Sequence, residues 1–466
     1  MCMNLYYSYF YFINIYIMDY KYLKYKNKYL EYKNNMVGGT REEDIIKLCH
    51  NDPTITEYDI IALDTDIIEH LIPVFLANTH LTKLSLVRIS PTAIEKTANA
   101  LAIILNNNKY ITTFSIFDTA ILNSDAFIQA FLINNTLTTL IFDNSQLIKS
   151  ILKSFEKMLS NNNIKKLHIR FNTFTPNQQD FKDEQNLITD ILAKSSTLNH
   201  LSELLLYDNN INILNIIVAL HTNTTLTRLL ISGNEINIEC AHAIAHLLKI
   251  NKHLNEIHFN DTHIDSHLIS IILEGLLHNN TLKILKLNTN RITSDCEIAI
   301  AYMLAHNNTL QELYLNSNMI TSNGIIAIAK SLINNNTLQE LNLYGNSYDD
   351  HIIQIYSEFI DLLKKNVIIK EINLNKNYNQ ENHRQLRALD NELYQILKEN
   401  EELPQIVNTK RMELYFSYYI HKKKVDKQEL PYLPIEIWLN MIDLQLTPRE
   451  LIYYQLMRKQ KTKILL

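Results

Sequence analysis

The chain repeats one arrangement of apolar and polar positions, Leu-x-x-Leu-x-Leu-x-x-Asn-x-Ile, over most of its length. A fixed period of about 20 to 29 residues with this leucine pattern predicts a solenoid, in which each unit contributes one strand and one helix. The clearest copies follow one another at steps of 28 residues and begin at Leu226, Leu254, Leu282, Leu310 and Leu338. Allowing Ile for Leu gives about eleven repeats, because further copies begin at Leu81, Ile111, Leu137, Ile164, Leu201 and Ile369.

Within each unit, the alternation of side chains across a strand predicts which positions are buried. Positions four and six, such as Leu285 and Leu287, should point inward, and positions three, five and seven should point outward. The segment that follows the strand predicts a helix, for which Thr321 or Ser322 is a candidate N-cap in one unit. The predicted buried helix faces are Ile325, Ile328, Ala329 and Leu332 in that unit, and Ile298, Ala301 and Leu304 in the unit before it.

The ninth position of the unit is predicted to stabilise the sharp turn after the strand. A buried Asn amide both donates and accepts hydrogen bonds, and an unpaired backbone group at this turn would cost about 1–3 kcal/mol. Thr119, Ser145 and Thr262 take this position in other units, where we expect looser turns because a hydroxyl replaces only part of that bonding. The predicted structural asparagine ladder is Asn172, Asn209, Asn234, Asn290, Asn318, Asn346 and Asn377.

Two segments precede the repeats. Residues 1–17 form an apolar leader that is shorter than the roughly 20 residues needed to span a bilayer, and one interpretation is that Met18 is the working start of the protein. Residues 18–40 carry Tyr and Leu at a seven-residue spacing, with Lys between them, and predict a basic amphipathic helix. Such a helix suits an anionic membrane or a partner groove, or it is a solvated leader.

The remaining segments are the solenoid and two helical extensions. The solenoid is predicted over residues 41–378, with an exposed loop near Thr173 to Gln185, where one repeat step lengthens. Residues 379–400 predict an amphipathic helix that caps the last unit, and residues 401–466 predict a helical C-terminal extension.

Outward positions of the predicted sheet supply a candidate contact surface. Position three reads Glu203, Arg228, Glu256, Ile284, Glu312, Glu340 and Glu371 along the C-terminal half, whereas Lys166, His168 and Arg170 make the same face basic nearer the N-terminus. The glutamates either recognise a basic surface or are solvated carboxylates screened by salt. Exposed Tyr and clustered exposed Leu are common at interfaces. The residues predicted to bind a protein are Glu203, Leu205, Tyr207, Leu230, Glu312, Tyr314, Glu340, Tyr344 and Glu371.

The composition argues against several classes of partner and of activity. The formal charge of −5 and the pI of 6.4 argue against nucleic acid as a partner, and four scattered cysteines fit a reducing compartment. The six glycines form no phosphate-binding motif and there is no H-E-x-x-H, so we predict no enzyme activity and no cofactor. Two histidine pairs at helical spacing, His242 with His246 and His263 with His267, lack further ligands apart from the nearby Asp265, and we interpret them as surface residues.

Three resemblances follow from these patterns. The 28-residue period with a full helix per unit, over residues 55–380, resembles the ribonuclease-inhibitor-like class of leucine-rich repeats; this implies a curved α/β solenoid, or horseshoe, with a parallel sheet on the concave face and helices on the convex face. The Tyr-Leu-Lys-Tyr-Lys sequence in the N-terminal segment resembles segments of giant-virus (mimivirus-like) proteins. The run from Leu433 to Leu451 resembles the opening of an F-box, which implies docking to a Skp-type adaptor of a ubiquitin ligase.

The leading functional hypothesis is a non-enzymatic, monomeric scaffold that binds a protein partner on its concave face, in the cytoplasm of a host cell or in a virion. One alternative is an F-box-like substrate adaptor. Another is a regulator of a small GTPase, because this class of repeats also resembles that of Ran GTPase activators. No transmembrane segment is expected.

Overall fold

The computed structural model describes residues 40–61, 68–89, 93–119, 125–145, 163–170, 178–194, 199–208, 210–347, 352–374 and 388–405, with a few isolated positions besides. These residues belong to two compact units, one ending at His263 and the other beginning at Ile264. Each unit alternates strands with helices, as the 28-residue period predicts.

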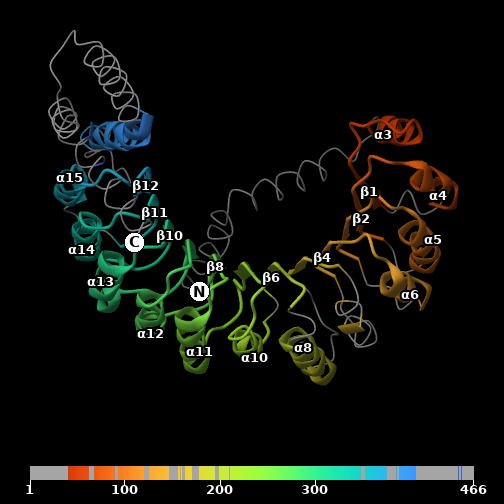
Figure 1. Ribbon diagram of the computed structural model, residues 1–466, viewed down its shortest axis with the longest axis horizontal. Coiled ribbons are helices and arrows are strands. Elements are labelled where there is room, and N and C mark those ends of the chain that lie inside the picture. Colours follow the sequence, from red (N-terminus) through yellow and green to blue (C-terminus); the bar gives the residue numbers. More distant parts are fainter. Residues whose placement is uncertain are drawn as a thin grey trace, which may run out of the picture. The chain divides into compact units, whose positions relative to one another are not determined.

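The first unit contains a sheet of parallel strands that pair in chain order. All helices labelled in this unit lie on one side of the sheet (Figure 1). The strands are β1 (Glu57–Ile61), β2 (Lys83–Val87), β3 (Thr113–Phe117), β4 (Thr139–Asp143), β5 (Lys166–Arg170), β6 (Glu203–Tyr207), β7 (Arg228–Leu230) and β8 (Glu256–His258). The helices are α3 (Thr40–Cys49), α4 (Ile68–Ala77), α5 (Ile94–Asn107), α6 (Asp125–Ile133), α8 (Gln178–Ala193), α10 (Leu214–Ala219) and α11 (Ile238–Ile250).

The second unit repeats the arrangement with shorter strands, which are again parallel and in register. Its helices also lie on one side of its sheet (Figure 1). The strands are β9 (Ile284–Lys286), β10 (Glu312–Tyr314), β11 (Glu340–Asn342) and β12 (Glu371–Asn373). The helices are α12 (Ser266–Leu277), α13 (Glu297–His306), α14 (Ser322–Leu332) and α15 (Ile352–Leu363), with a 3-10 turn, η2 (Ser294–Cys296), before α13.

The core of each unit lies between its sheet and its helices. Leu285 and Leu287 are 0% and 1% exposed, and the equivalent positions of the other strands are buried in the same way. Side chains at positions three, five and seven lie on the opposite face, which we call the open face. The predicted α/β solenoid of leucine-rich-repeat type is therefore confirmed.

The described residues contain one more repeat than the sequence pattern predicts. Strand β1 pairs with β2 from Glu57↔Lys83 to Ile61↔Val87, so a repeat begins at Ile55. Its fourth position is Tyr58 instead of Leu, and the Tyr58 ring packs edge-on against Phe75 at 5.5 Å between ring centroids. The aromatic ring fills the space of the missing leucine, which explains why the pattern did not indicate this unit.

A row of asparagines joins successive repeats. Each of these lead-in asparagines lies three residues before the first leucine of its repeat. Asn307 accepts hydrogen bonds from the backbone N–H groups of Thr309 (3.0 Å) and Leu310 (2.9 Å), and its Nδ2 donates to the Leu276 carbonyl near the end of α12, the helix of the preceding repeat (2.9 Å). This Asn therefore fixes the entry to a strand and satisfies a helix end in one step. The buried members of the row are Asn78, Asn108, Asn134, Asn223, Asn251, Asn279, Asn307, Asn335 and Asn366.

The ninth-position asparagines bond the turns after the strands. Oδ1 of Asn318 accepts from Ile292 N–H (3.2 Å), and its Nδ2 lies 3.0 Å from the carbonyls of both Leu287 and Leu315. Thr119 makes a smaller version of this arrangement, since its hydroxyl accepts from Ile89 N–H and donates to the Phe117 carbonyl. The ladder members Asn234, Asn290, Asn318 and Asn346 are buried, whereas Asn172, Asn209 and Asn377 lie outside the described residues.

The eighth residue of the repeat adopts a left-handed backbone conformation, and this conformation turns the chain out of the strand. Its φ is 48° at Asp118, 50° at Asp208 and 72° at Gly233. Short polar side chains and Gly tolerate this conformation better than other residues do. The same turn thus recurs whether Asn, Thr or Ser follows at position nine.

Three local predictions need correction. Residues 178–185, expected in a loop, belong to α8. Of the face predicted for α13, Leu304 is buried, Ala301 is half-buried and Ile298 is 80% exposed; Ile300 and Met303 are buried in its place. This helix is apolar on every side, so its pattern does not indicate which face is buried. Thr321 is the N-cap residue of α14, but its side chain makes no capping bond.

A buried carboxylate binds the N-cap residue itself. Glu297, in the first turn of α13, is 5% exposed and accepts from Thr321 N–H (2.5 Å) and the Thr321 hydroxyl (3.1 Å). A Cβ at Gly324 would lie 2.3 Å from the Glu297 carboxyl carbon, so only Gly leaves room for this contact. A carboxylate at a helix N-terminus also interacts favourably with the helix dipole.

The structure describes little beyond the last strand. Residues 388–405 are helical, and this segment contacts α15 through the Tyr356 hydroxyl on Asp390 (2.6 Å). Asn400 donates to the Asn366 carbonyl (3.3 Å), as Asn366 itself donates to the Asn335 carbonyl (3.2 Å), and so repeats the bonding of the lead-in asparagines. The predicted segments 1–17 and 18–39, and nearly all of 406–466, lie outside the described residues. None of the described helices is long and apolar enough to cross a bilayer.

Candidate functional site

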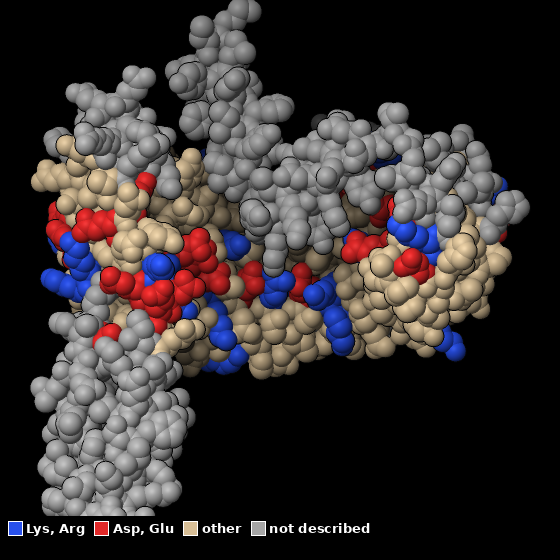
Figure 2. All heavy atoms as spheres, turned by 90° about the horizontal axis from the view of Figure 1, so that it is seen from above, with Lys and Arg blue, Asp and Glu red and all other residues tan. Residues whose placement is uncertain are grey.

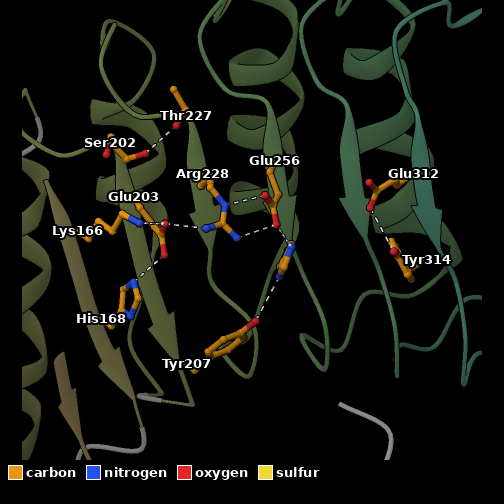
Figure 3. A network of polar contacts seen from close by, with 11 residues as sticks. Lys166, His168, Ser202, Glu203, Tyr207, Thr227, Arg228, Glu256, Glu312 and Tyr314 are labelled. Atoms are coloured by element: carbon orange, nitrogen blue, oxygen red, sulfur yellow. Dashed lines mark hydrogen bonds and ion pairs between the residues drawn. The ribbon is translucent and has the colours of Figure 1, made fainter. Parts of the chain in front are cut away.

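The open face of the first unit carries a row of alternating charges at position three. Arg228, on β7, lies between two carboxylates of the flanking strands: its Nη1 is 2.7 Å from Glu203 Oε2, and its Nε is 2.7 Å from Glu256 Oε2 (Figure 3). The strand register places these three side chains directly opposite one another. His168 and His258 each approach one of the glutamates at 2.7 Å, and Lys166 completes what we call the ionic row: Lys166, His168, Glu203, Arg228, Glu256 and His258.

The ionic row keeps both glutamates ionised. Burial works to raise the pKa of Glu203, but the hydrogen bond and charge of His168 and the charge of Arg228 lower it to about 2. At Glu256 burial is likewise outweighed by the hydrogen bonds of His258 and Arg228, which lower its pKa to about 2. The hydrogen bond to Glu256 raises the pKa of Arg228 in turn. Glu203 is therefore a partner within the sheet and not a solvated carboxylate, since its side chain is only 8% exposed.

The predicted contact residues Leu205 and Leu230 are buried, so their expected exposure needs correction. They are 6% and 5% exposed. Across the sheet, Leu205 is paired with His168 on one side, and Leu230 is paired with His258 on the other. Within each strand, the leucine lies two residues after a member of the ionic row. Tyr207 reaches across β7, so that its hydroxyl lies 3.3 Å from His258 Nδ1 (Figure 3). These neighbours enclose the edges of both leucines.

The open face of the second unit differs in charge. Glu312, Glu340 and Glu371 are direct neighbours at position three of β10, β11 and β12, and we call them the acidic row. The Tyr314 hydroxyl donates to Glu340 (2.5 Å) and Glu312 (3.2 Å), and Lys286 Nζ lies 4.6 Å from the centre of the Tyr314 ring. Figure 2 shows acidic side chains gathered over this unit, at the left of the view.

Burial and neighbouring negative charges raise pKa values in the acidic row. Burial, followed by repulsion from Glu340 and Glu312, raises the pKa of Glu371 above its ordinary value. Burial and the bonds to the two carboxylates raise the pKa of Tyr314 as well. Glu371 is exposed, and Tyr344, two positions after β11, is 36% exposed. The predicted residues Glu312, Tyr314, Glu340, Tyr344 and Glu371 are thus brought together on one accessible face.

A second acidic feature lies at the edge of the first unit, where β6, β7 and β8 end. The Asp208 carboxylate occupies the space next to Gly233, since a Cβ there would meet Asp208 Oδ1 at 1.6 Å. Burial and the charge of Asp261, partly offset by Arg170, raise the pKa of Asp208 to about 6. An ionised Asp208 therefore costs stability at neutral pH.

We expect Asp208→Asn to stabilise the protein at pH 7.5 by about 1–2 kcal/mol, given about 1.4 kcal/mol per pKa unit and partial solvent screening. The folded-state pKa is raised, so the cost is absent below the ordinary value of 3.8 and fully present above about 6. The gain should disappear as the pH falls from 6 to 4, measured by urea unfolding across that range. Asp118→Asn is the control, because Asp118 occupies the same position in an earlier repeat. It should give no gain, because Asp118 pairs with Arg88 at 3.2 Å.

The structure does not bring the two histidine pairs together with further candidate ligands within the described residues. His242, His246, His263 and His267 are exposed, and Asp265 is engaged as the N-cap of α12, where it accepts from Leu268 N–H (2.9 Å). His246 instead stacks edge-on against His221, with ring centroids 4.7 Å apart. The described residues contain no group of three or more His, Cys, Asp or Glu that could hold a metal ion.

Sequence reasoning missed His258, Glu297 and Asp208. His258 and Asp208 occupy outward or turn positions of the repeat, so register alone could have marked His258 as a neighbour of Leu230. Glu297 had no signal, because its partner lies at the start of the next helix and the contact depends on Gly324 having no side chain.

Comparison with known proteins adds little beyond the fold. No protein-family model and no curated protein matches the sequence. Among solved structures, the chain is similar to leiomodin-1 actin-binding site 2, with 24% identity and a TM-score of 0.33 over 38% of this chain and 98% of that one. It is also similar to the tropomodulin C-terminal domain of Caenorhabditis elegans, with 12% identity and a TM-score of 0.32 over 36% and 96% of the two chains. The assignment to leucine-rich-repeat solenoids therefore stands on the repeat and on the parallel sheets.

Proposed function

We propose that the protein is a non-enzymatic interaction scaffold, and that the open face of its second unit binds a basic segment of a protein partner. The acidic row is the observation that carries this proposal. Three glutamates in direct register repel one another, an arrangement that is mildly destabilising by itself. Cationic side chains of a partner would relieve that repulsion.

The neighbouring tyrosines support the same partner. Lys286 places its ammonium group over the Tyr314 ring, 4.6 Å from the ring centre, and a cationic side chain of a partner would make the same kind of contact with an aromatic ring on this face. Tyr344 offers a second, exposed ring two positions after β11. Tyrosine is common among the residues that contribute most to binding, so this surface combines charge recognition with apolar contact.

Fluorescence polarisation with twelve-residue peptides tests the proposal. Lys/Arg-rich peptides should bind more tightly than neutral or acidic ones, and their affinity should fall as salt rises. Glu340→Gln with Glu371→Gln should weaken binding at least tenfold. The matched control is Glu274→Gln with Glu358→Gln, which removes two exposed charges from α12 and α15 of the same unit.

Two results would contradict the proposal: equal affinity for all three peptide classes, or an equal loss of binding in the control variant. The F-box-like adaptor remains a prediction, because Leu433 to Leu451 lie outside the described residues apart from Glu450. The GTPase regulator also remains a prediction. The viral origin and the host cytoplasm also remain predictions.

A further inference from the structure

The outer side of α13, which faces away from the sheet, is apolar, whereas the outer sides of its neighbours are polar. Ile298 and Tyr302 on this side are 80% and 54% exposed. The exposed residues of the neighbouring helices are His267 and Glu274 on α12, and Asn323 and Lys330 on α14. A helix that is apolar on every side is ordinarily enclosed by apolar groups. The outer side of α13 is therefore expected to have a partner.

The apolar surface continues onto both neighbouring helices, which pack against α13. Ile326 on α14 occupies the same repeat position as Ile298, and both Ile326 and Ile271 on α12 are half-buried. Tyr302 is held in place by His306, whose Nδ1 donates to the Tyr302 carbonyl (2.7 Å) and whose ring lies 4.1 Å from the Tyr302 ring between centroids. Ile271, Ile298, Tyr302 and Ile326 thus form an ordered apolar surface, which we call the outer patch.

Two opposite charges flank the outer patch at the same level. Glu274 on α12, Tyr302 on α13 and Lys330 on α14 are each the eighth residue before the first leucine of the next repeat, so they form one row across the three helices. Glu274 and Lys330 are exposed, and neither forms an ion pair with another described residue. The surface is therefore negative on one side, positive on the other and apolar between them.

We propose that the outer patch binds a second copy of this chain, related to the first by a two-fold axis that runs along α13. Such an axis exchanges the two sides of the patch, so it places α12 of each copy opposite α14 of the other. Glu274 then faces Lys330 of the second copy, Lys330 faces Glu274 of the second copy, and the Tyr302 rings meet between these pairs. A two-fold axis across the helices would instead place α12 on α12 and form neither ion pair.

The three helices offer enough surface for a weak dimer. Helices of about 11 residues are about 17 Å long, and three of them at spacings of about 10 Å present roughly 500 Å² on each copy. A total of about 1,000 Å² is at the lower limit for a specific interface, so the dimer should form at micromolar concentrations. The monomer expected from the sequence would then exist only in dilute protein.

Sedimentation velocity of the full-length chain at a series of micromolar concentrations tests the proposal. The mass should rise from 54.5 kDa towards twice that value as the concentration increases. Tyr302→Asp should raise the dissociation constant of the dimer at least tenfold, because it places two carboxylates against each other at the two-fold axis. The matched control is Val218→Asp, which adds the same charge at the same helix position in α10, where Val218 is 49% exposed. This control should leave the dimer unchanged.

Charge reversal tests the two-fold arrangement itself. Glu274→Lys alone should weaken the dimer at least tenfold, because two lysines then face each other on both sides of the patch. Lys330→Glu alone should do the same with two glutamates. The double variant, Glu274→Lys with Lys330→Glu, should bring the dissociation constant back to within about threefold of the natural value, because opposite charges again face each other.

Three results would overturn the proposal: a chain that stays monomeric at every concentration, a dimer that Tyr302→Asp does not weaken, or a double reversal no tighter than the single ones. These outcomes are separate from the proposed peptide binding. The outer patch and the acidic row lie on opposite sides of the second unit (Figure 1), so Tyr302→Asp should bind the Lys/Arg-rich peptide with unchanged affinity.

Discussion

Arg228→Ala should lower the free energy of unfolding by about 2–3 kcal/mol, the range for the loss of charged hydrogen bonds at a partly exposed site. The substitution leaves Glu203 and Glu256, whose side chains are 8% and 13% exposed, without the cation that lies between them. The two carboxylates keep their bonds to His168 and His258 but lose their strongest cation in a poorly solvated place, which destabilises the folded state. Urea unfolding at pH 7 measures the loss.

The pH dependence of this loss distinguishes electrostatics from packing. In the native protein both glutamates have pKa values lowered to about 2, so their contribution is present above the ordinary value of 4.5 and is lost as the pH falls towards 2. Without Arg228 the two carboxyls protonate at higher pH, and the difference between the proteins should shrink below about pH 4.5.

Lys83→Ala is the matched control for Arg228→Ala. Lys83 lies at the same position of β2 and pairs with Glu57 at 2.8 Å, but Glu57 is half exposed. Exposed pairs contribute about 0–1 kcal/mol, so this variant should be nearly neutral. A loss at Arg228 no larger than that at Lys83, or one that does not change with pH, would contradict the role assigned to the ionic row.

Asn318→Ala should destabilise the protein by about 1–3 kcal/mol, the cost of one unsatisfied buried group. It leaves the buried Ile292 N–H without its acceptor, whereas the carbonyls of Leu287 and Leu315 keep the bonds they accept from Asn290 and Asn346. Circular dichroism during urea unfolding measures the effect. Neighbouring units stabilise one another in a solenoid, so the loss should spread beyond one repeat.

Two further variants show whether hydrogen bonding is the cause. Asn318→Thr should lose only part of the stability, because the Thr119 hydroxyl makes both an accepting and a donating bond at the same position of its own unit. Asn308→Ala removes an exposed asparagine with one bond to the His306 carbonyl and should be close to neutral. Equal losses for Ala and Thr at position 318 would refute the bonding explanation.

The fold could be predicted from the sequence because each unit repeats the same physical requirement. Leu285 and Leu287 alternate with polar residues, and that alternation determines which face of the strand is buried. Prediction failed where the pattern carries no direction. Helix α13 is apolar all round, so nothing in it indicated that Ile298 points to solvent and Ile300 to the core.

The candidate site could be predicted only in part. Alternation correctly placed Glu203 and Leu205 on the open face, yet both are buried beside groups of the neighbouring strands. Arg228 was visible between Glu203 and Glu256 in the sequence, but the 2.7 Å contacts require a register and side-chain conformations that only the structure provides. The acidic row needed the register alone, so its members could be named in advance.

The lead-in asparagines have a consequence for making the protein. Asn134, Asn223, Asn279, Asn307 and Asn335 are each followed two residues later by Thr, which makes them acceptor sequences for N-linked sugar. Each is at most 6% exposed, and the Nδ2 that would carry the sugar donates a buried hydrogen bond at Asn134, Asn307 and Asn335. A sugar attached there has no room in the stacked repeats. Passage of the unfolded chain through a glycosylating secretory pathway would therefore yield molecules in which adjoining units cannot close on each other.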